Sequence, residues 1–184
     1  MGRRNILLSL LAWIVPAALA AHPIDETKVM TSSRFVVGGK TVDFEVKFPA
    51  ENYARVAPGA ASDAAKTLRA LDSEEGKRRL SEYVRAHLLA FDGKANLPAT
   101  VTKIEIERNA LSVDNLPREV LAWGRFEGTM TIRDLYLFNE FFKEGPLPHF
   151  GDAVVEREAE RYDFQFKEAV YFHLDLTAPR RPKE

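Results

Sequence analysis

The 184-residue sequence predicts a mainly β fold, an antiparallel β-sandwich with an α-helical insert after its first hairpin. Three observations favour this fold. Apolar and polar residues alternate strictly over residues 42–48, a segment with helical spacing follows, and several short alternating segments fill the second half of the chain. Turn-forming residues separate these segments at short intervals, which is typical of antiparallel β domains.

The first hairpin is predicted on either side of Gly38-Gly39. Val42 begins an alternation that runs to Phe48, and a period of two indicates a strand with one buried face. Two glycines readily adopt the positive φ angles of a two-residue turn, so we expect Phe35 to pair with Val42. The apolar side chains of both strands then share one face.

The helical insert follows this hairpin. We expect a loop over residues 50–61, a short helix over residues 62–71, and a longer amphipathic helix over residues 74–90. Ser73 is a favourable N-cap for the longer helix, because its hydroxyl can accept a hydrogen bond from a free backbone N–H. Asp92-Gly93 is expected to stop the helix.

Further strands complete the predicted domain. Glycines inside one of the long alternating segments indicate a bulge or a close neighbour, and Trp123 in the same segment is expected in the core. We expect an immunoglobulin-like sandwich in a single domain over residues 21–178, followed by a flexible polar tail over residues 179–184. Alternation predicts the strands over residues 102–106, 120–132, 162–166 and 170–176, whereas residues 135–142 fit either a strand or a helical turn.

Residues 1–20 have the layout of a secretory signal peptide. Arg3-Arg4 is followed by an apolar run over residues 6–15 and by Ala18-Leu19-Ala20, whose small residues suit a signal peptidase. The run is shorter than the roughly 17–25 residues of a membrane-spanning helix. We therefore expect cleavage after Ala20 and a periplasmic or secreted protein, with no transmembrane segment in its mature form.

The composition limits the classes of function. Of the 26 basic residues, two lie in the predicted signal, so against 27 acidic residues the mature net charge is −3. A near-neutral surface argues against a nucleic-acid partner. There is no cysteine, which excludes thiolate metal sites and thiol catalysis, and no Gly-x-Ser-x-Gly motif of a serine hydrolase. A protein without enzymatic activity is therefore favoured over an enzyme.

Histidine is the best metal-ligating residue type that the chain offers. His22 lies second in the predicted mature chain, where its imidazole and the terminal amine can hold Cu²⁺ or Ni²⁺ together, and cleavage one residue later would strengthen that site. His149 is expected in an exposed proline-rich loop that could supply a further ligand. His87 is expected to be partly buried on a helix, and His173 to lie on the surface of the last strand.

Four short motifs resemble the extracytoplasmic N-terminal region of HupE/UreJ-type membrane proteins. They are Ala21-His22-Pro23 after the signal, the hairpin, Phe91-Asp92-Gly93-Lys94 after the helical insert, and Leu137-Phe138 followed by His149. The family is linked to nickel handling for hydrogenase and urease, and its members continue into several membrane helices. The resemblance implies a version of the soluble module without the transport part.

We therefore expect an exported, non-enzymatic binding or accessory module that is linked to nickel or copper handling. A membrane transporter or another periplasmic protein would be its partner. The alternative is a small periplasmic hydrolase, or another enzyme whose dispersed catalytic residues form no motif.

Overall fold

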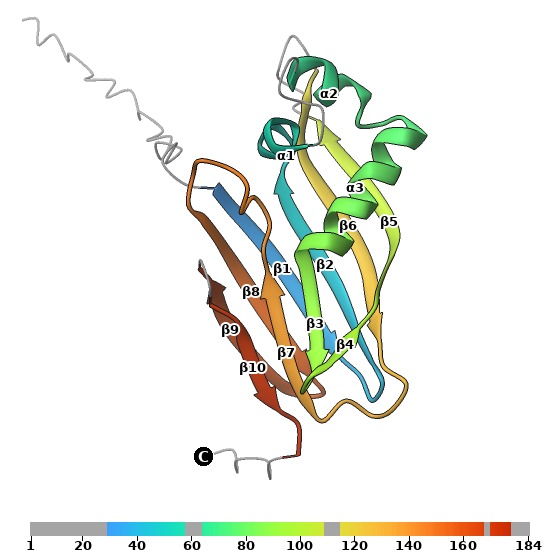
Figure 1. The fold of residues 1–184 in the computed structure, drawn as a ribbon, viewed down its shortest axis with the longest axis vertical. Helices are drawn as coiled ribbons and strands as arrows, with labels where there is room; N and C mark the ends of the chain where they lie inside the picture. Colours follow the sequence, from blue (N-terminus) through green and yellow to red (C-terminus); the bar gives the residue numbers. More distant parts are fainter. Residues whose placement is uncertain (1–28, 58–63, 109–114, 168–169, 178–184) are drawn as a thin grey trace, which may run out of the picture.

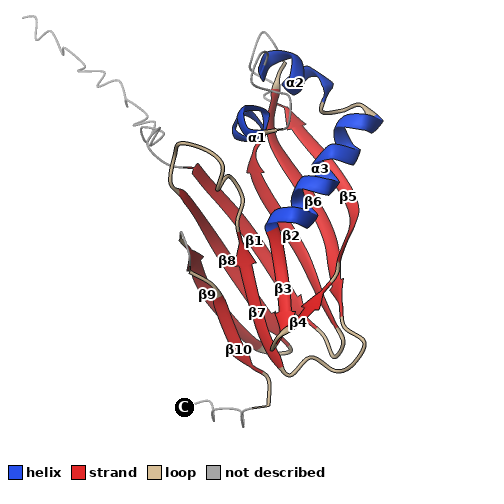
Figure 2. Cartoon of the chain, viewed as in Figure 1, coloured by secondary structure: helices blue, strands red, loops and turns tan. Residues whose placement is uncertain are grey.

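The computed structural model describes residues 29–57, 64–108, 115–167 and 170–177. The predicted signal peptide, His22 and the predicted tail over residues 179–184 lie outside these ranges. The described chain forms two β-sheets and a group of helices (Figures 1 and 2). The elements are β1 (Val29–Val37), β2 (Thr41–Pro49), α1 (Ala50–Val56), α2 (Ala64–Ala70), α3 (Glu74–His87), β3 (Leu88–Asp92), β4 (Ala95–Leu97), β5 (Ala99–Arg108), β6 (Pro117–Glu127), β7 (Asp134–Asn139), β8 (His149–Arg157), β9 (Glu160–Phe166) and β10 (Phe172–Asp175).

The protein is mainly β, as the sequence predicts. A six-stranded sheet has the order β5-β6-β2-β1-β8-β9, and a four-stranded sheet has the order β10-β7-β3-β4. Most neighbouring strands are antiparallel, but β1 and β8 run parallel. The prediction of an antiparallel fold did not include this pair, because its strands lie far apart in the chain and only the tertiary structure joins them.

The hairpin of β1 and β2 has the predicted faces but a different register. Val37 pairs with Val42 and Phe35 with Phe44, so the predicted pairing of Phe35 with Val42 is wrong by two residues. The connection spans residues 38–40, and the N–H of Gly38 closes it by donating to the carbonyl of Thr41, the first residue of β2, at 2.8 Å. A shift of two residues leaves every side chain on its original face, and the apolar set is accordingly buried.

The first helix occupies part of the segment that was expected to be a loop. Pro49 takes the N-cap position of α1, and Tyr53 is buried with only 2% of its surface exposed. The burial of Tyr53 favours a helix in this alanine-containing segment, although its sequence shows no helical periodicity. The short helix expected over residues 62–71 is observed as α2, within the described residues.

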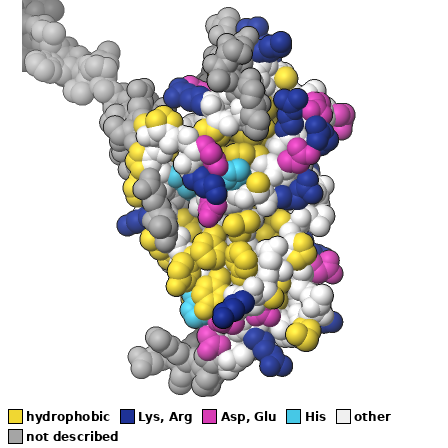
Figure 3. All heavy atoms as spheres, in the orientation of Figure 1, with side chains coloured by type: hydrophobic (Ala, Val, Ile, Leu, Met, Phe, Trp, Pro, Cys, Tyr) yellow, Lys and Arg dark blue, Asp and Glu magenta, His cyan; other side chains and the backbone are white. Residues whose placement is uncertain are grey.

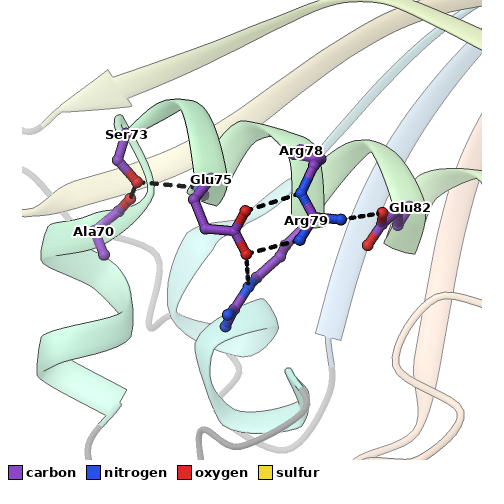
Figure 4. A network of polar contacts seen from close by, with 7 residues as sticks. Ala70, Ser73, Glu75, Arg78, Arg79 and Glu82 are labelled. Carbon is purple, nitrogen blue, oxygen red and sulfur yellow. Dashed lines mark hydrogen bonds and ion pairs between the residues drawn. The ribbon is translucent and has the colours of Figure 1, made fainter.

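Helix α3 begins as predicted and ends earlier. The Oγ of Ser73 accepts the N–H of Gly76 at 3.0 Å and donates to the carbonyl of Ala70 (Figure 4). The helix ends at His87 instead of residue 90, and β3 follows at once. Leu88 and Ala90 are buried in β3, which pairs with β7. Their spacing fits a strand period of two as well as a helix, and here the pairing with β7 prevails over helical propensity.

Strand β6 shows why a glycine is needed in the six-stranded sheet. A Cβ atom on Gly124 would lie 2.3 Å from the carbonyl oxygen of Thr100 and 2.4 Å from the ring of Phe44, so the predicted close neighbour is confirmed. Strand β6 ends at Glu127, five residues before the expected end. Trp123 is half-buried on the outer face of the sheet, where the Nζ of Lys103 lies 4.7 Å from the ring centroid, so its assignment to the core is wrong.

Both sheets and the helices enclose one hydrophobic core. The helices lie beside the four-stranded sheet on the same side of the six-stranded sheet, with α1 against β6 and α3 against β5 (Figure 2). Three aromatic rings connect the six-stranded sheet, α3 and the segment after β7. The ring centroid of Phe48 lies 6.2 Å from that of Tyr83 and 5.1 Å from that of Phe141. Within the described residues, no helix is both long and apolar enough to cross a membrane.

Candidate functional site

His149 lies in the protein interior and not in an exposed loop. It is the first residue of β8, only 7% of its surface is exposed, and burial lowers the pKa of its imidazole to about 4. The expected exposure is therefore wrong, because the proline-rich segment before it leads directly into a central strand. Among the residues that the structure describes, no group of three His, Asp or Glu side chains is arranged to hold a metal ion. The metal-binding role of His22 stays a prediction.

A buried polar network explains the position of His149. The Oγ1 of Thr31 lies 2.9 Å from the Nε2 of His149, and the side-chain amide of Asn139 donates to the same hydroxyl at 3.3 Å. The Asn139 carbonyl oxygen accepts the N–H of Phe141. Because the hydroxyl oxygen accepts a hydrogen bond from Asn139, the hydroxyl can donate its own hydrogen bond to the Nε2 of a neutral imidazole. The network connects the two sheets and is structural in character.

His87 pairs with Glu144 at the end of α3. Its Nε2 lies 2.9 Å from a carboxylate oxygen of Glu144, and its Nδ1 lies 2.9 Å from the carbonyl oxygen of Tyr83. Although partial burial acts in the opposite direction, hydrogen bonds from His87 and from the backbone leave the pKa of Glu144 below its ordinary value. Both contacts of His87 are oxygen atoms, so the ring is held between the backbone of α3 and the carboxylate of Glu144. The predicted partial burial of His87 is confirmed.

The outer side of the four-stranded sheet carries a cluster of aromatic rings. We call this surface the aromatic face and define it by Phe91, Tyr136, Phe138, Tyr171 and His173. Alternation places these side chains outward, while their neighbours in the strands point into the core. Figure 3 shows a continuous apolar area on this side of the molecule. No helix or second sheet covers the face in the described structure.

The rings of the aromatic face are held by one another. Phe91 meets Phe138 edge-on with centroids 5.6 Å apart, and Phe138 lies 5.3 Å from Tyr171. His173 stacks on Tyr136 at 4.3 Å, and its expected surface position is confirmed because 43% of its side chain is exposed. Tyr171 is 47% exposed. The cluster therefore presents a pre-formed, uneven apolar surface.

Carboxylates border one end of the aromatic face. The charged side chains that point outward from β7 and β10 are Asp134 and Asp175, and a carboxylate oxygen of Asp134 lies 2.6 Å from the Nε2 of His173. Partial burial and then the negative charge of Asp134 raise the pKa of Tyr136 above its ordinary value. The carboxylate of Asp175 accepts hydrogen bonds from the backbone and the hydroxyl of Thr177.

The sequence contained a signal for this surface. In the segment from Leu135 to Phe138, both alternating sets are apolar or aromatic, which indicates a strand with two apolar faces. The sequence leaves this segment open between a strand and a helical turn and places Phe91 at the end of the helical insert, so it does not predict that the rings lie together. Comparison with known proteins gives no match, either to a protein-family model or to a curated protein. The resemblance to HupE/UreJ-type proteins stays a prediction.

Proposed function

We propose that the protein is an exported, non-enzymatic accessory module that binds another protein through its aromatic face. The exposed rings on the four-stranded sheet are the observation that carries this proposal. Contiguous apolar surface of this kind mostly marks interaction sites in soluble domains, and aromatic residues are enriched where binding energy concentrates. Their mutual packing lowers the entropy lost on binding.

The shape and charge of the face favour a protein segment over a sugar. A sugar ring stacks on an open aromatic plane, but one side of Tyr136 is covered by His173, and Phe91 stands at 83° to Phe138. An uneven surface of this kind suits interdigitating side chains. Asp134 and Asp175 at its end complement a basic residue, so the proposed occupant presents apolar side chains next to a lysine or arginine.

The sequence supports a cellular location and a process for the proposed module. The signal-like residues 1–20 support export to the periplasm or beyond, and the resemblance to HupE/UreJ-type proteins supports a membrane transporter as the partner and nickel or copper handling as the process. The order of the elements, with α1 to α3 between β2 and β3, supports an immunoglobulin-like sandwich with a helical insert.

Site-specific photo-crosslinking in the native host tests the proposal. A photoreactive amino acid at position 171 should give one defined protein adduct, whereas the same group at Met130, which is 73% exposed in the connection between β6 and β7, should give none. Equal adducts at both positions, or no protein adduct at position 171, would contradict the proposal.

The purified partner then allows a quantitative comparison. Tyr171→Ser combined with Phe138→Ser should weaken binding by at least about tenfold, as truncation of aromatic anchors commonly does. Val36→Ser is the matched control, because Val36 is 38% exposed on the six-stranded sheet. Asp134→Asn should slow association and reduce its dependence on salt. An unchanged affinity of the double variant would refute the role of the aromatic face.

A further inference from the structure

Strand β10 is an edge strand that pairs on one side only. It is the first strand in the order β10-β7-β3-β4, and no described strand pairs with its outer edge (Figure 1). Residues 172–175 pair with β7, and a bond from the N–H of Leu176 to the carbonyl of Arg133 extends this ladder. The backbone N–H and C=O groups along the outer edge of such a strand can pair with another chain.

The hydrogen bonds to β7 determine which backbone groups of β10 point to its outer edge. In an antiparallel pair, residues that exchange backbone bonds with the partner strand alternate with residues that exchange none. Leu176 donates to β7, so Leu174 and Phe172 also direct their backbone groups toward β7. The N–H and C=O groups of His173 and Asp175 therefore point to the outer edge.

The other side of β7 agrees with this assignment. The carbonyl of Asp134 accepts the N–H of Gly93 at 2.7 Å, so Asp134 directs its backbone toward β3 and not toward β10. Asp134 lies opposite Asp175 in the register. The backbone of Asp175 is accordingly directed away from β7, as the alternation requires.

Strand β10 has fewer features that oppose pairing than the other edge strands. The edge strands β5 and β9 of the six-stranded sheet each carry several charged residues, and the register of β5 is shifted at two places. Strand β4, at the other edge of the four-stranded sheet, has only three residues. Charges, bulges and short length all protect an edge. In β10, Asp175 is the single Asp, Glu, Lys or Arg residue, and the register is regular.

The sequence of β10 is complementary to itself in the antiparallel direction. A two-fold axis at Leu174 places His173 of one copy opposite Asp175 of the other, and the symmetry repeats this pair. Both residues direct their backbone outward, so each pair exchanges two N–H···O=C bonds. On the side that faces the core, the same axis places Leu174 opposite its own copy and Phe172 opposite Leu176.

Other positions of the axis pair the residues less well. An axis at His173 places two imidazoles opposite each other, and an axis at Asp175 does the same with two carboxylates, which is destabilising. An axis between two residues would place outer side chains opposite inner ones. The axis at Leu174 also brings an imidazole of the second copy beside Asp134 and Asp175, two carboxylates that lie directly opposite each other in one chain.

Apolar side chains beside this edge are incompletely covered. Leu174, Leu176, Tyr162 and Phe164 pack against the core but are only half-buried. Strands β9 and β10 lie side by side here, since the ring centroid of Phe172 lies 5.5 Å from that of Phe164. A second copy of β10 would continue the four-stranded sheet and bury more of this apolar surface, which favours association.

We propose that the protein forms a symmetric homodimer through β10, in which the four-stranded sheets of two copies join into one continuous sheet. The contact is short, so we expect a dissociation constant of about 10–100 μM. Because the axis keeps both outer sides on one surface, the aromatic faces of the two copies lie side by side. The partner proposed for the aromatic face is a different protein, and the dimer does not depend on it.

Sedimentation velocity of the exported protein from about 1 to about 500 μM tests the dimer, which should form across this range. Asp175→Lys should weaken it at least about tenfold, because lysine at an edge opposes pairing, and should keep the fold, because it removes the repulsion from Asp134. Asp163→Lys, the same change on β9, should dimerise as the unaltered protein does. A monomer at every concentration, or equal dimerisation of Asp175→Lys, would overturn the proposal. Dimers that form only after removal of residues 178–184 would also overturn it and would assign the edge to the chain's own tail.

Single cysteines test the position of the axis, because the chain contains no cysteine. The two Cα atoms of residue 174 should lie about 4.5 Å apart, which is within the range of a disulfide. Leu174→Cys should therefore crosslink with itself under mild oxidation. His173→Cys and Asp175→Cys should crosslink when mixed and not alone. Crosslinking of either one alone, or none in the mixture, would overturn the proposed pairing.

Discussion

Acid should destabilise the protein through the burial of His149. The imidazole is 7% exposed, accepts a hydrogen bond from Thr31, and has a pKa of about 4 against an ordinary value of 6.5. In the unfolded chain the same group takes up a proton at about pH 6.5. As the pH falls, the unfolded state therefore binds this proton first, and folding stability is lost between pH 6.5 and pH 4.

The size of the loss follows from these two pKa values. One unit of pKa difference corresponds to about 1.4 kcal/mol, and linkage with the values of 6.5 and about 4 gives a loss of about 2 kcal/mol between pH 8 and pH 5. For a domain of this size the melting temperature should fall by about 4–8 °C. Carboxylates that titrate in the same window contribute as well, so the His149 share must be isolated by a variant.

Denaturant unfolding at pH 8 and pH 5, followed by the fluorescence of Trp123, measures that share. His149→Gln keeps an acceptor for Thr31 and removes the titrating ring, so this variant should lose about 2 kcal/mol less than the unaltered protein over the same interval. The reasoning is refuted if His149→Gln shows the full pH-dependent loss.

The remaining predictions concern two neighbouring hydroxyls and the N-terminal metal site. Ser33 is 6% exposed and its hydroxyl has no hydrogen-bond partner in the described structure, so Ser33→Ala should raise the free energy of unfolding by about 1 kcal/mol in denaturant melts. Thr31→Val should lower it by about 1–3 kcal/mol, because it leaves His149 and Asn139 without their shared partner; equal effects of both variants would contradict the network. Calorimetry of the exported protein should detect Cu²⁺ binding more tightly than Ni²⁺, with loss of binding in His22→Ala and on acidification below about pH 6. Undiminished binding by that variant would end the metal hypothesis.

The sequence determined the elements whose signals are local. The alternation after Thr41 predicted which side chains of the first hairpin are buried, because side chains of a strand alternate whatever its partner is. Ser73 predicted the start of α3, because a capping hydroxyl acts on backbone groups only a few residues away. The glycine in β6 likewise indicated a close neighbour before the identity of that neighbour was known.

Only the tertiary structure decided the features that join distant segments. Leu88 to Asp92 satisfies both helical and strand periods, and pairing with β7 resolves the ambiguity in favour of a strand. His149 looked exposed beside prolines, but parallel pairing of β8 with β1 carries it next to Thr31, 118 residues earlier in the chain.

The aromatic face has the same origin. Phe91 and Tyr171 come from opposite ends of the four-stranded sheet's sequence range, and strand pairing brings them to one surface. Local periodicity determines on which side of an element a residue lies. The contacts that this residue makes with other elements depend on the free energy of burial and of strand pairing over the whole chain. No local sequence pattern reports that free energy.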